Sequence, residues 1–190
     1  MPTTVGVANC GVSLIIENTQ SLSTGQVRKC DVANTAHGPV KAMQLDSTKT
    51  EELANELKDY LTSLPTDANV SVFLYSSPES ILKHTFLTML HKLIDLGLLR
   101  LICVDETRQF VRFGSSFRPE FGDLRKKLFS KVVLKDSDFQ FHTSSPVPLS
   151  GNILLKVPVL FMTATMSMDL LQQLQVLVGI KILHDMCLWG

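Results

Sequence analysis

Residues 98–107, with the sequence L-L-R-L-I-C-V-D-E-T, constrain the fold of this chain more than any other stretch. A short run of bulky apolar residues, some of them β-branched, is typical of a strand buried on both faces of a parallel sheet. Two adjacent carboxylates do not fit inside such a sheet, so we expect Asp105 and Glu106 just past the carboxyl end of the strand. In open α/β sheets, ligands bind at that end. The stretch therefore predicts a buried strand that carries two carboxylates to a binding edge.

The chemistry of this pair suggests a specific role. An Asp at the end of a strand can hold Mg²⁺, usually through water, and a neighbouring Glu can polarise an attacking water molecule. Asp105 followed by Glu106 has this Walker B arrangement, which is found in nucleotide hydrolases. The alternative is a strand that simply ends in an acidic turn, and a two-residue motif does not decide between them.

The rest of the chain alternates strand-like and helix-like segments, which predicts an α/β domain of three layers with a mainly parallel sheet. We expect one helix to open at a capping box formed by Thr48 and Glu51, and another to run from Ser77 to about Leu96. A short basic helix is expected over residues 123–129, and a last helix begins near Thr165 or Ser167. The expected strands cover residues 12–16, 41–45, 70–75, 98–104 and 157–162.

Composition limits the possible partners. The 190 residues suit one domain, and 18 basic residues balance 18 acidic ones, so any nucleic-acid site must be local. The four cysteines show no C-x-x-C spacing, which predicts neither a zinc site nor a disulfide framework. Neither a signal peptide nor an 18-residue apolar run is present, so we expect a soluble intracellular protein without a membrane segment.

Residues 105–121 resemble a segment of RecQ-type DNA helicases. They read D-E-T-R-Q-F-V-R-F-G-S-S-F-R-P-E-F, and the family typically reads D-E-A-H-C-x-S-Q-W-G-H-D-F-R-P-x-Y from motif II into its aromatic-rich loop. Residues 158–165, P-V-L-F-M-T-A-T, are similar to the strand and motif III of that family. Residues 75–79, Y-S-S-P-E, are similar to its Y-x-x-P-E segment, so that the resemblance covers about residues 12–182.

The resemblance implies that residues 1–190 are part of the first RecA-like, ATP-binding domain of an ATP-dependent 3′–5′ DNA helicase. Residues 135–152, rich in Ser, Pro and Asp, would be an exposed insertion. The implied cofactors are ATP and Mg²⁺, with Asp105 at the metal, and the implied partner is single-stranded or branched DNA in recombination and repair, in the nucleus or cytoplasm. The implied catalytic residues are Asp105, Glu106, Thr163 and Thr165. The implied DNA-binding residues are Arg108, Arg112, Phe113, Phe117 and Arg118.

Several departures from the family predict a loss of activity. Arg108 replaces the motif II His, and Arg112 and Phe113 replace a Gln-Trp pair, in the region that couples DNA binding to hydrolysis. Arg108 is instead expected to pair with the neighbouring carboxylates. The sequence contains no Gly-Lys pair, which a phosphate-binding loop requires, and no second motor domain. We therefore expect a helicase fragment that is inactive in isolation. The alternatives are a non-catalytic module that binds nucleic acid or protein, and a metal-dependent hydrolase that uses Asp105 and Glu106 without ATP.

Overall fold

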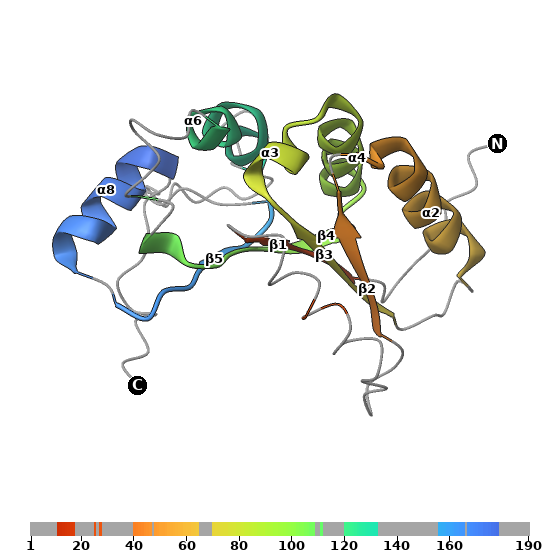
Figure 1. The fold of residues 1–190 in the computed structure, drawn as a ribbon, viewed down its shortest axis with the longest axis horizontal. Coiled ribbons are helices and arrows are strands. Elements are labelled where there is room, and N and C mark those ends of the chain that lie inside the picture. Colours follow the sequence, from red (N-terminus) through yellow and green to blue (C-terminus); the bar gives the residue numbers. More distant parts are fainter. Residues whose placement is uncertain are drawn as a thin grey trace, which may run out of the picture.

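A five-stranded parallel sheet forms the centre of the molecule (Figure 1). The computed structural model describes residues 11–17, 25, 27, 40–46, 48–64, 70–108, 111, 120–132, 156–165 and 167–178. The strands are β1 (Gly11–Ile16), β2 (Val40–Leu45), β3 (Ser71–Ser76), β4 (Leu99–Val104) and β5 (Val159–Phe161). Their order across the sheet is β2-β3-β1-β4-β5, and every neighbouring pair is parallel. The predicted α/β class with a parallel sheet is confirmed. It is consistent with a RecA-like three-layer fold, of which the described residues show the sheet and one helix layer.

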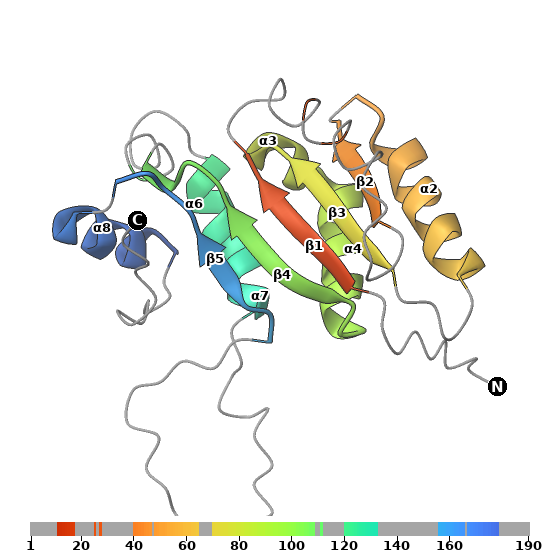
Figure 2. The same ribbon diagram turned by 90° about the horizontal axis from the view of Figure 1, so that it is seen from below.

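The helices of the described chain lie on one side of the sheet (Figures 1 and 2). Helix α8 lies furthest out, beyond the β5 edge. None of the described helices has the length and apolar character needed to span a membrane. The helical elements are α2 (Thr50–Ser63), α3 (Pro78–Ile81), α4 (His84–Asp95), α6 (Glu120–Leu124), the π-helical turn η1 (Arg125–Phe129), α7 (Ser130–Val132) and α8 (Met168–Val178).

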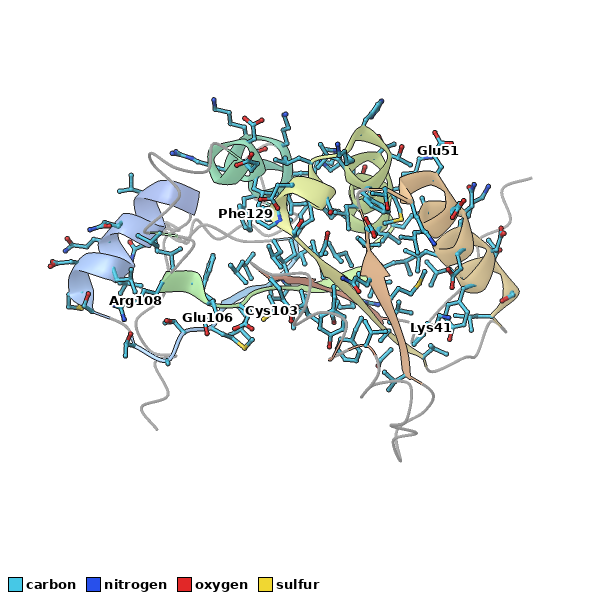
Figure 3. The ribbon with its side chains drawn as sticks, viewed as in Figure 1. Lys41, Glu51, Cys103, Glu106, Arg108 and Phe129 are labelled. Carbon is cyan, nitrogen blue, oxygen red and sulfur yellow. The ribbon has the colours of Figure 1, made fainter. Side chains whose placement is uncertain are left out.

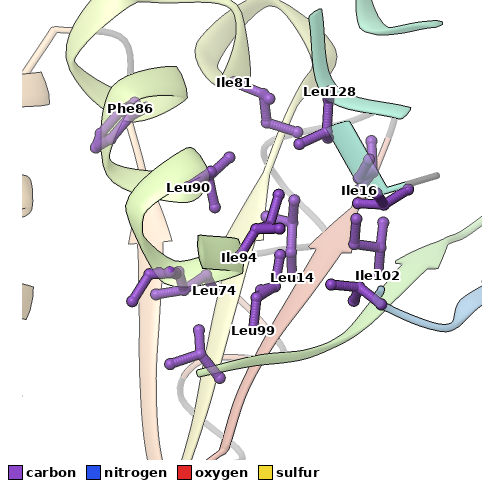
Figure 4. Close-up of a cluster of buried hydrophobic side chains, with 14 of the residues drawn as sticks. Leu14, Ile16, Leu74, Ile81, Phe86, Leu90, Ile94, Leu99, Ile102 and Leu128 are labelled. Atoms are coloured by element: carbon purple, nitrogen blue, oxygen red, sulfur yellow. The ribbon is translucent and has the colours of Figure 1, made fainter. Parts of the chain in front are cut away.

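The hydrophobic core lies between the sheet and this helix layer (Figure 4). Leu14 of β1, Leu74 of β3 and Ile102 of β4 have no exposed surface, because neighbouring parallel strands present paired residues to the same face. On the helix side, the fully buried side chains of Leu90 in α4 and Leu128 in η1 belong to the same core. This buried layer holds β1, β3 and β4 in fixed register, and therefore fixes where each strand ends.

The start of α2 differs from the predicted capping box. Thr48 does not cap the helix, because its backbone N–H and its hydroxyl both donate to Oδ1 of Asp46, each at 2.9 Å. These hydrogen bonds lower the pKa of the Asp46 carboxyl. The residue at the cap position is Lys49, which provides no side-chain hydrogen bond. The predicted helix forms, but the Thr48 hydroxyl that would cap it is hydrogen-bonded to Asp46 in a local turn at residues 46–48.

The single helix predicted from Ser77 to about Leu96 is wrong, because the structure divides it in two. Ser77 caps α3 as predicted, accepting a hydrogen bond from the Ser80 N–H, but Lys83 is extended and separates α3 from α4. Ile81 and Phe86, on either side of the break, are both fully buried. In a continuous helix these two residues would lie about 140° apart around the axis. The break therefore allows both side chains to enter the same core.

Candidate functional site

Asp105 and Glu106 follow directly after β4, at the carboxyl end of the sheet. The backbone N–H of Asp105 donates to the carbonyl of Ile16 at the end of β1, at 2.9 Å. Oδ1 of Asp105 accepts the backbone N–H of Glu106 at 2.8 Å, and the Asp105 side chain is half-buried. Glu106 is exposed and has a φ of 50°, in the left-handed region that non-glycine residues seldom adopt. Strained residues of this kind are concentrated at functional sites.

Thr107 connects these carboxylates to the neighbouring strand. Its side chain is fully buried and its hydroxyl donates to the carbonyl of Val104 at 3.1 Å. Its backbone N–H donates to the carbonyl of Met162, directly after β5, at 2.9 Å. Sequence reasoning gave Thr107 no role, although the structure makes it the link between the ends of β4 and β5.

Thr163 and Thr165 follow β5 at the same edge of the sheet. The Thr163 side chain is half-buried and its hydroxyl donates to the carbonyl of Thr165 at 3.2 Å, whereas Thr165 is exposed. The structure thus places Asp105 and Glu106 after one strand and both threonines after its parallel neighbour, with Thr107 joining the two segments. Their catalytic roles remain predictions.

The predicted DNA-binding residues are only partly described. Arg108 is exposed and lies at the same edge as Glu106 (Figure 3). Contrary to expectation, Arg108 forms no ion pair with Asp105 or Glu106; the described ion pairs involve lysines 41, 127 and 131. The remaining predicted residues, Arg112, Phe113, Phe117 and Arg118, lie outside the described residues, as does the predicted insertion 135–152.

Glu17 is a residue of this edge that sequence reasoning missed. It follows β1 directly, only 2% of it is exposed, and its backbone N–H donates to the carbonyl of Ser76 at 2.9 Å. The signal was present in the sequence, because Glu17 ends the apolar run V-S-L-I-I in the same way that Asp105 ends the run of β4. β1 and β4 are parallel neighbours, so both carboxylates reach the same edge.

The thiol of Cys103, two residues before Asp105, is affected by these nearby carboxylates. Burial of the thiol, followed by the negative charges of Asp105 and Glu17, raises the pKa of Cys103 from 9.0 to about 11. The thiol therefore stays protonated, and unreactive as a nucleophile, over the physiological pH range.

No protein-family model matches this sequence, and no curated protein matches it. Within the ranges that the structure describes, no three His, Cys, Asp or Glu side chains come together as metal ligands.

The residues of the edge do not fit a complete ATP·Mg²⁺ site. Mg²⁺ is usually held by one or two carboxylates together with phosphate oxygens of the substrate. Asp105 offers one such carboxylate, and its Oδ1 also accepts the Glu106 N–H. The phosphates would need a glycine-rich loop that ends in Gly-Lys, and no Gly-Lys pair occurs in the sequence.

The raised pKa of Cys103 leads to a prediction about stability at high pH. Between pH 9 and 11 the unfolded thiol loses its proton while the folded thiol keeps it, so the unfolded state binds fewer protons and stability falls as pH rises. Cys103→Ala removes this contribution but leaves a small cavity. We therefore expect Cys103→Ala to have a lower free energy of unfolding than wild type at pH 7. The gap between the two free energies should become smaller between pH 9 and 11, because only wild type loses stability through this thiol.

Urea unfolding of both proteins at several pH values measures this difference. The other three cysteines are present in both proteins, so their titration cancels. If the free energies of unfolding of the two proteins differed by the same amount at every pH from 7 to 11, the raised pKa of Cys103 would be contradicted.

Proposed function

We propose that this chain is a helicase-like module, related to the first motor domain of RecQ-type ATP-dependent 3′–5′ DNA helicases, and that it binds DNA without hydrolysing ATP by itself. The observation that carries the proposal is the common edge formed by Asp105-Glu106 after β4 and Thr163-Ala164-Thr165 after β5. These two segments are the ones that resemble motifs II and III. Thr107 joins them through a backbone hydrogen bond.

The strand order supports the proposal independently of the motifs. β4, which carries the acidic pair, lies between β1 and β5, so the ends of three parallel strands converge around Asp105. Ligands of open α/β sheets bind at such carboxyl ends. Glu106 in its left-handed conformation projects from this edge, exposed to solvent. The geometry is suited to presenting an acidic pair to a ligand rather than to burying it as a packing element.

The DNA contacts are proposed for the segment that follows the acidic pair. It alternates cations with aromatic rings at Arg108, Arg112, Phe113, Phe117 and Arg118, a combination that suits single-stranded nucleic acid. Because the chain has no net charge, binding would depend on this local group of cations. A role with DNA would place the chain in the nucleus or cytoplasm. A module that binds another protein through the same segment is the second possibility.

The double variant Arg112→Ala, Phe113→Ala tests the DNA contacts. We expect its affinity for single-stranded DNA to fall by roughly tenfold or more, because stacking contributes about 1–3 kcal/mol per base and the lost cation weakens the phosphate contact. The salt dependence of binding should also become shallower. Fluorescence anisotropy with a labelled oligonucleotide, at several salt concentrations, measures both effects.

The matched control is the double variant Lys126→Ala, Leu96→Ala, which also removes one cation and one apolar side chain. Both residues are exposed and lie on the helix side of the sheet. This control should bind DNA as wild type does. If the Arg112, Phe113 variant keeps both its affinity and its salt dependence, the segment is not the DNA site. If wild type itself does not bind single-stranded DNA, the proposed DNA-binding function is wrong.

A further inference from the structure

The π-helical turn η1 lies beside the strand that leads to the candidate site. It continues α6 into α7, and these elements lie behind β4 and β5 in Figure 2. The ring of Phe129, the last residue of η1, contacts Phe161 of β5 with 6.4 Å between ring centres. Phe161 is followed by Met162, whose carbonyl accepts the Thr107 N–H, and then by Thr163. η1 is therefore in contact with the strand that positions one half of the candidate site.

The width of this turn determines which side chains reach the core. Leu124, directly before η1, and Phe129 within it both have no exposed surface. In a continuous α-helix, residues five apart lie about 140° apart around the axis, so these two side chains would face different directions. The hydrogen bonds of a π-helical turn join residues five apart, which brings such a pair onto one side of the helix. The π-helical register therefore allows Phe129 to reach Phe161.

Two side chains bind backbone carbonyls of this turn. The Ser130 N–H donates to the carbonyl of Arg125, five residues back, whereas in an α-helix it would donate to the carbonyl of Lys126. The Lys126 carbonyl accepts the hydroxyl of Ser130 instead. The next carbonyl, that of Lys127, accepts a hydrogen bond from Nε2 of His91 in α4, at 2.7 Å. Ser130 is exposed and His91 is half-buried, so both hydrogen bonds lie at the surface of the helix layer.

The segment has two alternative registers, which differ in the acceptor of the Ser130 N–H. While the Ser130 hydroxyl is bound to the Lys126 carbonyl, this N–H donates to Arg125 and the turn is π-helical. Without the hydroxyl, the Lys126 carbonyl can accept the N–H of residue 130, which is the α-helical hydrogen bond. Single π-helical turns within α-helices are frequently found at functional sites. An element with two discrete arrangements is also what coupling between distant positions requires.

We propose that η1 is a two-state element that couples the surface of the helix layer to the candidate site. In the π-helical register, stabilised by Ser130 and His91, Phe129 packs on Phe161 and supports the end of β5. In the α-helical register Phe129 turns away from β5, and the segment that carries Thr163 loses this support. The Ser130 hydroxyl controls the equilibrium, because a change that removes its proton favours the α-helical register. The proposal does not depend on DNA binding or on the helicase resemblance.

Nuclear magnetic resonance of the full 190-residue chain tests this coupling. In the double variant Ser130→Ala, His91→Ala we expect the cross-peak between the rings of Phe129 and Phe161 to weaken by roughly threefold or more, because two hydrogen bonds that favour the π-helical register are lost. The methyl signals of the threonines that follow β5, at positions 163 and 165, should shift at the same time. A variant that was only less stable would keep the ring contact in its native state. Ser130→Thr keeps the hydroxyl and should give the wild-type signals.

The matched control is the double variant Ser63→Ala, His84→Ala. Ser63 is exposed at the end of α2, where its hydroxyl donates to a carbonyl of the same helix, and His84 is exposed in α4 and bonds within that helix. Neither hydrogen bond involves η1, so this control should give the wild-type signals. The single variants Ser130→Ala and His91→Ala are measured in the same way, so the test remains valid if the double variant does not fold.

Three results would overturn the proposal. Retention of the full ring cross-peak in Ser130→Ala, in His91→Ala and in their combination would show that the register does not depend on these hydrogen bonds. Loss of the cross-peak without a shift of the Thr163 and Thr165 methyl signals would show that η1 is not coupled to the candidate site. Equal changes in the control would show that they arise from the loss of any surface hydroxyl and imidazole.

Discussion

Purified residues 1–190 are expected to release phosphate from ATP no faster than the uncatalysed background, with Mg²⁺ present and with or without single-stranded DNA. Catalysis of phosphoryl transfer depends almost entirely on positioning and on electrostatic stabilisation of the phosphates. Asp105 could neutralise charge through a metal ion, but the sequence has no Gly-Lys pair to orient the phosphates. An arginine finger alone contributes roughly 10³–10⁵ in rate where it operates. Arg108 is exposed, but it lies on the same loop as the two carboxylates, so we do not expect it to act as an arginine finger.

The variant Glu106→Gln makes this assay decisive, because it removes the carboxylate that would polarise the attacking water and preserves the size of the side chain. Turnover that is equal in wild type and Glu106→Gln would come from a contaminating hydrolase and would agree with the prediction. Turnover that DNA stimulates and that Glu106→Gln abolishes would show that the chain contains a phosphate site of another kind. Such a result would overturn the proposal that the module is inactive by itself.

The strands and the candidate edge could be predicted from the sequence because both depend on local patterns. A buried parallel strand needs an apolar run, and such runs precede both Asp105 and Thr163. The parallel arrangement then brings their carboxyl ends to one edge, as the structure shows. Glu17 follows the same rule after β1, but a single carboxylate at the end of a strand is a weaker signal than the adjacent pair Asp105-Glu106.

The helix boundaries could not be predicted because they depend on tertiary packing. The apolar pattern of residues 77–96 allowed one long helix, and only the shared core explains the break that buries both Ile81 and Phe86. The basic helix expected over residues 123–129 is in fact α6 followed by the π-helical turn η1. Such turns are rare, and no local signal in the sequence distinguishes them from an α-helix.

The role of Thr107 also lay beyond sequence reasoning. Its buried hydroxyl and its hydrogen bond to Met162 depend on how β4 and β5 pair, and therefore on two segments more than fifty residues apart in the chain. The left-handed conformation of Glu106 has the same origin, since residues 105 and 107 on either side of it are fixed by bonds to Ile16 and Met162. A pattern in one segment contains no information about this constraint.

A large loss of stability is expected for Phe129→Ala. Phe129 lies in η1, has no exposed surface, and packs its ring against Phe161 of β5 at a 44° angle between the ring planes. Truncation removes the buried ring and leaves a cavity between η1 and the sheet, which typically costs about 3–5 kcal/mol. This is a large part of the roughly 5–15 kcal/mol that stabilises a typical domain. Urea unfolding followed by circular dichroism measures the loss.

The control for this prediction is Val176→Ala in α8, because Val176 is 71% exposed and its truncation should change stability by no more than about 0.5 kcal/mol. A Phe129→Leu variant, which keeps most of the buried volume, should lose less than Phe129→Ala. If Phe129→Ala were as stable as the Val176 control, the packing of η1 on β5 would be wrong. The position of Thr163 would then be in question too, because Phe129 contacts the strand that leads directly to it.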